Sequence, residues 1–260
     1  MKLKLHTTTL GYGEPLLMIH GWGWHSGIWQ SLLPQLTTQY RITLVDLPGF
    51  GLSPSILQQN YTLNYIVELL LEVAPNSAHW LGWSLGGLLA TAAALHSPHR
   101  VRSVINVTSS PCFTQEEEWP GMKHTTLQNF AELLSSDYQK TLRDFLILQL
   151  HGTANARPLF RQLQTDVLYK YVPEVASLAG SLQLLRQNDL RSSLVQLQCP
   201  CLYIFGRLDA LIPVTVIPRL QHYLPQAQSA IIERASHMPF LSHRDEFMGL
   251  LDKFITKERL

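Results

Sequence analysis

One pentapeptide constrains this chain more than any other feature. Gly82-Trp83-Ser84-Leu85-Gly86 places a serine between two glycines, where an apolar strand-like run meets an apolar helix-like run. A serine can be held on a sharp, strained turn there only if the residues two before and two after it lack a β-carbon. Such a turn exposes the hydroxyl above the strand end. The pattern predicts a nucleophile at Ser84, and the alternative is a small-residue turn without chemistry.

The segments around this turn alternate between strand and helix periodicity. The expected strands cover residues 15–20, 41–46, 79–82, 101–107, 201–205 and 229–233, and the expected helices cover residues 63–74 and 85–96 and the stretch after residue 243. Strands that are apolar nearly throughout are typical of a parallel sheet covered on both faces. We therefore expect an α/β fold with a mostly parallel central sheet and helices on both sides.

Residues 112–187 differ in texture from the rest of the chain. They show long helical patterns and no strand-like run, and strand character returns only at Cys201. We expect an α/β core formed by residues 1–111 and 188–260, interrupted by a helical cap over residues 112–187. Ligands of open α/β sheets bind beyond the carboxyl ends of the strands, so we expect the cap over that edge.

The composition and charge of the chain argue against several classes of protein, including nucleic-acid-binding and membrane-spanning proteins. The 260 residues are 46% hydrophobic and 15% charged, and a net charge of +1 gives no overall attraction to nucleic acid or anionic lipid. No apolar run reaches the roughly 18 residues of a membrane span, and residues 1–21 lack the apolar core of a signal peptide. Cys112, Cys199 and Cys201 form no CxxC motif. We expect a cytoplasmic protein with reduced thiols.

A serine hydroxyl becomes nucleophilic only when a base takes its proton and an acid orients that base. In chains with this elbow the order is serine, acid, histidine. Asp209 and His237 each lie in a loop directly after a strand-like run, whereas His222 and His243 fall in helical stretches. We predict a triad of Ser84, Asp209 and His237. The alternatives are a solvated turn aspartate and a surface histidine.

The oxyanion formed during attack on an ester needs two N–H donors. Leu85 follows the serine at a helix N-terminus, and Trp22 lies in a glycine-rich loop after the first apolar run, so we predict these two main-chain donors. The alternative for Trp22 is core packing alone. We expect Asp46 to cap a turn, and no metal site at His20 and His25, which lack acidic or thiol partners.

The motifs together resemble a known superfamily. In chain order they are His-Gly-Trp-Gly, Asp-Leu-Pro-Gly-Phe-Gly-x-Ser, Gly-Trp-Ser-Leu-Gly-Gly, Gly-x-x-Asp-x-x-x-Pro and Ser-His-x-Pro-Phe. This series resembles the α/β hydrolases. Finer stretches resemble the biotin-pathway carboxylesterases over essentially the whole chain, namely 80–88, 109–113, 118–121 and 145–149.

The resemblance implies a reaction and a set of roles. Enzymes of that family hydrolyse the methyl ester of a pimeloyl chain on acyl carrier protein to free acid and methanol, without a cofactor. The resemblance implies Ser84 as the nucleophile, Asp209 as the acid and His237 as the base. It implies that Trp22 and Leu85 are the oxyanion donors and that the segment from Phe145 to Gln149 binds the acyl chain.

The resemblance also implies a partner. Acyl carrier proteins are acidic, so their docking surface should be basic. The basic residues near the acyl-binding segment are Lys140, Arg143, Arg157 and Arg161. Three nearby carboxylates reduce the positive charge of this region, namely Asp137, Asp144 and Asp166. The alternative to a docking surface is an ordinary solvated face. We expect a monomer with no nucleic-acid or membrane partner.

Other functions are compatible with the same triad. A general short-chain carboxylesterase or a carbon–carbon bond hydrolase would use the same three residues with a different pocket. A hydrolase-fold binding protein would keep the pocket without chemistry. Dehalogenases and epoxide hydrolases of the superfamily use an aspartate nucleophile, and Ser84 argues against both.

Overall fold

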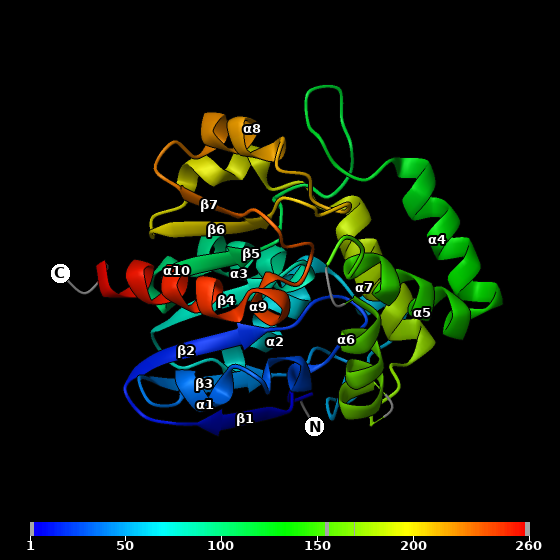
Figure 1. The fold of residues 1–260 in the computed structure, drawn as a ribbon, viewed down its shortest axis with the longest axis horizontal. Coiled ribbons are helices and arrows are strands. Elements are labelled where there is room, and N and C mark those ends of the chain that lie inside the picture. The colour runs from blue at the N-terminus through cyan, green and yellow to red at the C-terminus, as the bar shows by residue number, and fades with distance from the viewer. Residues whose placement is uncertain (1–2, 154–155, 169, 258–260) are drawn as a thin grey trace.

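A seven-stranded sheet organises the chain. The computed structural model describes residues 3–153, 156–168 and 170–257, and within them the strand order is β1-β3-β2-β4-β5-β6-β7 (Figure 1). β1 runs antiparallel to β3 and every other neighbouring pair is parallel. The strands are β1 (Thr7–Leu10), β2 (Glu14–Ile19), β3 (Tyr40–Val45), β4 (Ala78–Trp83), β5 (Val101–Val107), β6 (Cys201–Gly206) and β7 (Gln228–Ile232). The mostly parallel sheet expected from the sequence is confirmed.

Helices cover both faces of this sheet. α10 crosses in front of the strands in Figure 1, and α2 and α3 lie behind them. The helices of the core are α1 (Leu33–Leu36), α2 (Leu63–Val73), α3 (Leu85–His96), α8 (Val216–Tyr223), α9 (Pro239–Ser242) and α10 (Arg244–Lys257). Every position of β4 and β6 is buried, because both strands lie between two helical layers.

Helix α3 lies against the centre of the sheet, in contact with β4 and β5. Its sequence is rich in glycine and alanine, and each residue from Leu85 to Ala94 is buried. The small side chains let the helix approach the strands closely. Its observed bounds, and those of β5, are the ones that the periodicity predicts.

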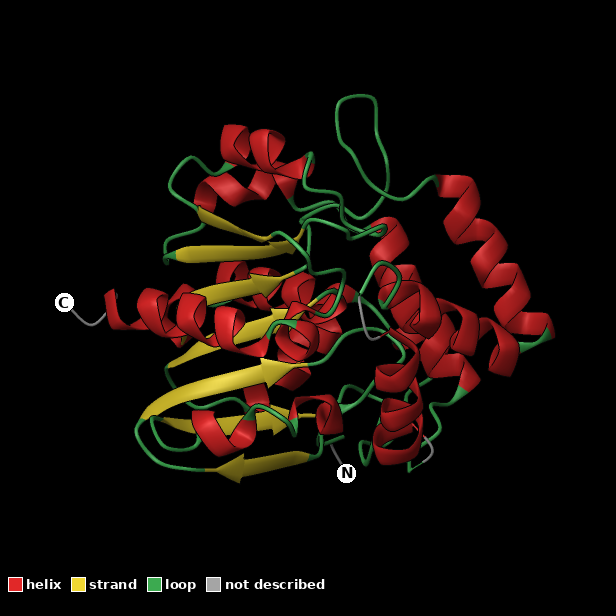
Figure 2. Ribbon diagram, in the orientation of Figure 1, coloured by secondary structure: helices red, strands yellow, loops and turns green. Residues whose placement is uncertain are grey.

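The described residues between 112 and 187 are called the helical insert below. They lie beyond the carboxyl ends of the parallel strands, where the arrowheads point in Figure 2. The helices are α4 (His124–Ser136), α5 (Tyr138–Gln149), α6 (Ala156–Leu163), the π-helical turn η4 (Gln164–Leu168) and α7 (Val175–Gln187). Cys112 pairs with Asp189 in an isolated antiparallel bridge. The chain therefore leaves and rejoins the core at one place.

Two features differ from the sequence expectation. Strand β1 was not anticipated, because its residues are largely exposed and show no apolar alternation. The long helical pattern through residues 126–150 is divided into two helices at Asp137, whose φ of −146° is not helical. The Asp137 carboxylate accepts the N–H of Lys140 at 3.1 Å, which caps the new helix and favours the break.

Other expectations concern thiols and membrane segments. Cys112, Cys199 and Cys201 are free in the structure. Among the residues that the structure describes, none of the helices combines the length and the apolarity that crossing a bilayer requires.

The contact of α3 with β2 leaves no room for a side chain at Gly86. A β-carbon there would lie 2.3 Å from the carbonyl oxygen of Ile19 and 2.8 Å from that of His20. We expect Gly86→Ala to lower the free energy of unfolding by about 2 kcal/mol, because a packed backbone must shift. Urea denaturation measures the change.

A glycine in open space provides the matched control. A β-carbon at Gly249, in α10, would meet no atom within 4 Å beyond its own stretch of helix backbone. Gly249→Ala should therefore raise stability by about 0.5–1 kcal/mol through helix propensity. Similar unfolding free energies for the two variants would contradict the packing argument.

Candidate active site

Ser84 occupies a strained turn between β4 and α3. Its φ is 54° and its ψ is −115°, and a β-carbon at Gly82 would lie 2.1 Å from the carbonyl oxygen of Gly86. The main chain of Ser84 is held on both sides, since its N–H donates to the carbonyl of Val107 at 2.9 Å and its carbonyl accepts from the Ser109 hydroxyl at 2.7 Å. The serine therefore has the conformation that the flanking glycines predict.

Asp209 and His237 form a buried pair beyond the ends of β6 and β7. Nδ1 of His237 lies 2.8 Å from Oδ2 of Asp209, and the other carboxylate oxygen accepts the N–H groups of Leu211 and Ile212 at 2.8 and 3.1 Å. A carboxylate accepts here, so the imidazole proton belongs on Nδ1 and the lone pair on Nε2. That Nε2 atom is buried and has no hydrogen-bond partner in the described residues.

The loop of His237 is fastened to the strand that carries Ser84. The indole Nε1 of Trp83, the residue before the serine, donates to the carbonyl oxygen of His237 at 2.8 Å, and the two rings lie 5.7 Å apart. In the part of the chain that the structure describes, no hydrogen bond joins the Ser84 hydroxyl to His237. Catalytic contacts of this kind often tighten only when substrate binds.

The two predicted oxyanion donors lie at the same edge of the sheet. Leu85 is the first residue of α3, and Trp22 lies in the turn after β2. Within the described ranges, neither main-chain N–H donates to a protein acceptor. Two unpaired donors beside a strained serine are what a developing oxyanion requires.

The loop of Trp22 is fastened to the helical insert at three points. Three side chains of the loop donate these bonds, from Trp22 Nε1 to the Leu178 carbonyl (3.0 Å), from Trp24 Nε1 to Gln149 Oε1 (2.7 Å) and from His25 Nε2 to the Val167 carbonyl (3.0 Å). His25 can donate from Nε2 because its Nδ1 accepts the N–H of Gly27 at 3.1 Å, which places the proton of this neutral ring on Nε2. Helices α7 and α5 and the turn η4 thus fix this loop.

The predicted acyl-binding segment meets the loop of Trp22. The ring of Phe145 packs edge-on to Trp22 at 4.9 Å and lies 4.9 Å from the ring of Phe130. Gln149 is fully buried, and its Nε2 has no partner among the described residues. Sequence reasoning missed Phe130, although its position three residues after the buried Leu127 places it on the same face of α4.

His20 braces the loop in the neutral form. The fully buried ring accepts the N–H of Leu47 on Nε2 at 3.0 Å, so its proton is on Nδ1, which donates to the Gly21 carbonyl at 2.8 Å. Burial disfavours the charged ring and lowers the pKa of His20 from 6.5 to about 4. Both nitrogens are used in main-chain bonds.

Asp46 has the structural role that the sequence indicates. Its carboxylate accepts the N–H of Ser26 at 2.8 Å and that of Leu52 at 3.0 Å. Burial alone would raise the pKa of Asp46. The pKa is held below its ordinary value by the His20 ring, which is protonated in the acid range where Asp46 titrates, and by these two N–H groups. The charged carboxylate therefore ties two loops together and takes no place beside Ser84.

The four predicted docking residues come together between α5 and α6. They line two adjoining clefts, of about 570 and 380 Å³, which share Phe160 in their walls. Lys140 and Arg143 lie 3.1 and 3.7 Å from the carboxylate of Asp144. Arg157 and Arg161 have no acidic partner in the described part of the chain, and the Asp166 side chain lies outside it.

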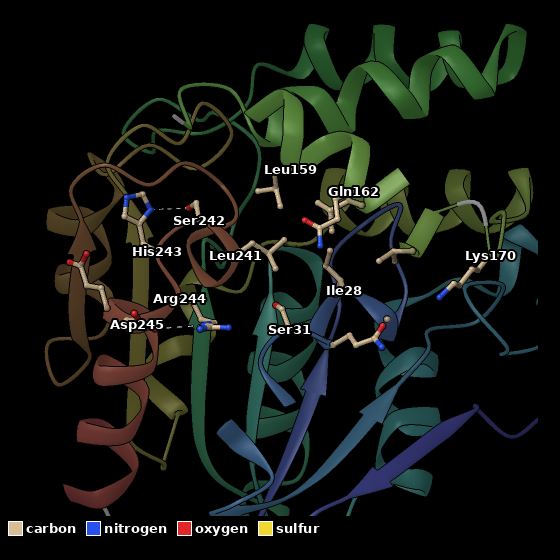
Figure 3. A pocket seen from close by; sticks show the side chains of 15 residues that line it. Ile28, Ser31, Leu159, Gln162, Lys170, Leu241, Ser242, His243, Arg244 and Asp245 are labelled. Atoms are coloured by element: carbon tan, nitrogen blue, oxygen red, sulfur yellow. Dashed lines mark hydrogen bonds and ion pairs between the residues drawn. The ribbon is translucent and has the colours of Figure 1, made fainter. Parts of the chain in front are cut away.

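A larger cleft, of about 800 Å³, opens between α6 and the start of α10 (Figure 3). Leu159 and Gln162 of α6 face it from the insert, and Ile28 and Leu241 face it from the core. None of the predicted site residues lines this cleft. Its size therefore does not mark it as the place of the chemistry.

Comparison with known proteins decides the family. The family described as "alpha/beta hydrolase fold" matches residues 14–244. The chain belongs to the α/β-hydrolase family. This hydrolase is 41% identical to the pimeloyl-[acyl-carrier protein] methyl ester esterase of Aeromonas hydrophila, over 97% of this chain and 100% of the relative. It is 44% identical to the protein of the same name from Serratia marcescens, over 97% of this chain and 98% of the relative.

Solved structures show the same fold for this hydrolase. An esterase from Exiguobacterium antarcticum superimposes with a TM-score of 0.88 at 22% identity, over 98% of this chain and 96% of that one. A bromoperoxidase from Bacillus anthracis gives a TM-score of 0.87 at 21% identity, with coverage of 98% and 96%. The α/β-hydrolase fold expected from the sequence is confirmed.

The buried His20 makes the stability of this hydrolase depend on pH. Below its ordinary pKa of 6.5 the unfolded chain binds a proton that the folded chain refuses until about pH 4. Stability should therefore fall as pH falls through this window, by up to about 3 kcal/mol from this ring. Urea denaturation at about pH 7.5 and about pH 4.5 measures the loss.

Removing the imidazole should flatten that dependence. We expect His20→Gln to be less stable than the wild type at neutral pH but to lose less on acidification. The matched control is His99→Gln, at an exposed position, which should leave the wild-type slope unchanged. An identical slope for His20→Gln and the wild type would contradict the assignment to His20.

Proposed function

We propose that this hydrolase is a serine carboxylesterase that converts the methyl ester of pimeloyl-[acyl-carrier protein] to the free acid and methanol in biotin biosynthesis. The observation that carries the chemistry is the buried His237–Asp209 pair, with its unpaired Nε2 at the sheet edge of the strained Ser84. Support for the substrate comes from relatives named for this activity, which match over 97% of the chain.

The proposed mechanism follows from these groups. Nε2 of His237 takes the proton of Ser84 as its Oγ attacks the ester carbonyl, and Asp209 stabilises the imidazolium. The oxyanion accepts hydrogen bonds from the N–H groups of Trp22 and Leu85. The intermediate collapses, methanol leaves with the proton from His237, and water repeats the cycle on the acyl-enzyme. Each step uses groups of the chain itself, so the proposal includes no cofactor or metal.

The helical insert is proposed as the substrate-binding cap, residues 112–187, on a core of residues 1–111 and 188–260. The aromatic rings of Trp22, Phe130 and Phe145 offer apolar surface to a chain of methylene groups. The Gln149 side chain contributes a buried amide donor to the same segment. Apolar walls with a few fixed polar groups are typical of small-molecule sites.

The acidic carrier is proposed to dock over α5 and α6. Arg143, Arg157 and Arg161 line one cleft together with Ile147 and Phe160, which combines positive charge with apolar surface. Opposite charge speeds encounter and selects the partner. We further propose that the protein acts as a monomer in the cytoplasm, a reducing compartment that suits its free thiols.

Covalent labelling separates an esterase from a binding protein. A fluorophosphonate should label Ser84, and Ser84→Ala should abolish labelling and lower hydrolysis by at least about 10³-fold, because the nucleophile is removed. Ser103→Ala, which changes a buried serine bonded to His79 away from the site, is the control. A wild-type protein that resists labelling would point to a binding protein.

The substrate assignment is tested by a second measurement, a comparison of hydrolysis kinetics on two substrates. The ratio of kcat/KM for carrier-bound pimeloyl methyl ester to that for a short p-nitrophenyl ester should strongly favour the carrier-bound substrate. Comparable values would favour a general short-chain carboxylesterase. Turnover of carbon–carbon bond substrates alone would favour the other hydrolase alternative.

Charge reversal tests the docking face. We expect the double variant Arg157→Glu and Arg161→Glu to lower kcat/KM for the carrier-bound ester by about 10-fold, because neither guanidinium is neutralised by a described carboxylate. Hydrolysis of the short ester should stay at the wild-type rate. Steady-state kinetics at low and high salt measure both, and the difference should shrink as salt screens the charges.

A distant pair of cations serves as the control. Lys253 and Lys257 are four residues apart and exposed on α10, near the chain end marked C and away from the insert (Figure 1). Their double reversal to glutamate should leave both substrates unaffected. An equal loss on both substrates in the arginine variant would argue against docking at α6.

A further inference from the structure

Thr108 has a backbone conformation that nothing in the proposed chemistry explains. It directly follows β5 and has a φ of 42°, and in the described residues only one other non-glycine residue, Ser84, has a positive φ. A β-branched side chain is strongly disfavoured in this region. Strain of this kind persists only where the surrounding structure enforces it, and it concentrates at functional sites.

The hydroxyl of Thr108 is bonded to the loop of the proposed base. It donates to the carbonyl oxygen of His237 at 2.8 Å, the same oxygen that accepts the Trp83 indole at 2.8 Å. Thr108 is fully buried, and its own N–H donates to the Ile204 carbonyl at 2.8 Å. Two donors held by the core of the sheet therefore occupy both acceptor positions of one carbonyl.

The next residue, Ser109, holds the main chain of the proposed nucleophile in the same way. The Ser109 hydroxyl donates to the carbonyl oxygen of Ser84 at 2.7 Å. In a regular strand, successive side chains point to opposite faces. The turn at Thr108 ends that alternation, and two consecutive hydroxyls reach the main chains of both Ser84 and His237.

We propose that Thr108 is a positioning residue that sets the main chain of His237 relative to Ser84. It touches no reacting atom and acts through the carbonyl of residue 237. The inference rests on the proposed Ser84–His237 chemistry and deepens it. Proton transfer between these residues requires near-contact geometry, and small displacements of catalytic groups are costly in rate. The strained turn is maintained because the hydroxyl is needed at that place.

Two substitutions separate the hydroxyl from the shape of the side chain. Thr108→Val keeps the volume and the branch and removes the donor, whereas Thr108→Ser keeps the donor. We expect Thr108→Val to lower kcat for the short ester and for the carrier-bound ester by about 10-fold, with KM nearly unchanged. Labelling of Ser84 by fluorophosphonate should slow by the same factor. Thr108→Ser should restore both rates to within about 3-fold of the wild type.

A matched threonine controls for the loss of a hydroxyl as such. The Thr37 hydroxyl, at the C-terminal cap of α1 and away from the site, donates to the Leu33 carbonyl at 2.7 Å. Thr37→Val should leave kcat and the labelling rate unchanged. Thermal unfolding of each variant is measured alongside, so that rates are compared well below the melting temperature.

The outcomes decide between positioning and mere stability. A Thr108→Val protein with a lowered melting temperature but wild-type kcat and labelling overturns the proposal, and so does failure of Thr108→Ser to restore the rates. If Thr108→Val does not fold, Trp83→Phe removes the other donor to the same carbonyl, and an unchanged labelling rate there overturns it too. A wild type that is not labelled at all would instead show that the proposed function fails.

Discussion

The close approach of α3 to the ends of β2 and β4 is the constraint on which the rest of the structure depends. Neither Gly82 nor Gly86 has room for a β-carbon, and the chain between them can turn only through a strained residue, Ser84. A strained turn persists because its surroundings over-determine it. Here the surroundings are a strand and a helix that are buried along nearly their whole length, so the hydrophobic core holds Ser84 in place.

Around that turn, loops without regular structure are held by hydrogen bonds. Side-chain groups donate these bonds to main-chain or amide oxygens. The indoles of Trp22, Trp24 and Trp83 each donate Nε1 to a residue more than 100 positions away. An indole suits this task because its rings pack in the core while its one polar atom makes a directional bond. The loops of His237 and Trp22 are therefore held in place although neither is helix or strand.

Much of this architecture could be predicted from the sequence, because the signals are local. The apolar runs of β5 and α3 have unbroken periodicity and give the observed bounds. The positions of Ser84, Asp209 and His237 directly after β4, β6 and β7 also follow from the apolar runs that precede them. Strand β1 could not be predicted, since an exposed edge strand needs no apolar pattern. The positive φ of Thr108 could not either, because it is imposed by distant partners that meet only in the folded chain.

The bridge between Cys112 and Asp189 has a consequence for how such enzymes diversify. A segment whose two ends meet can be exchanged as a module without rethreading the sheet, so the helical insert can change while the strands of the core stay as they are. Such an exchange must, however, satisfy one structural requirement. Any replacement must present acceptors for the side chains of Trp22, Trp24 and His25, and this requirement couples changes in the helical insert to changes in the loop of Trp22.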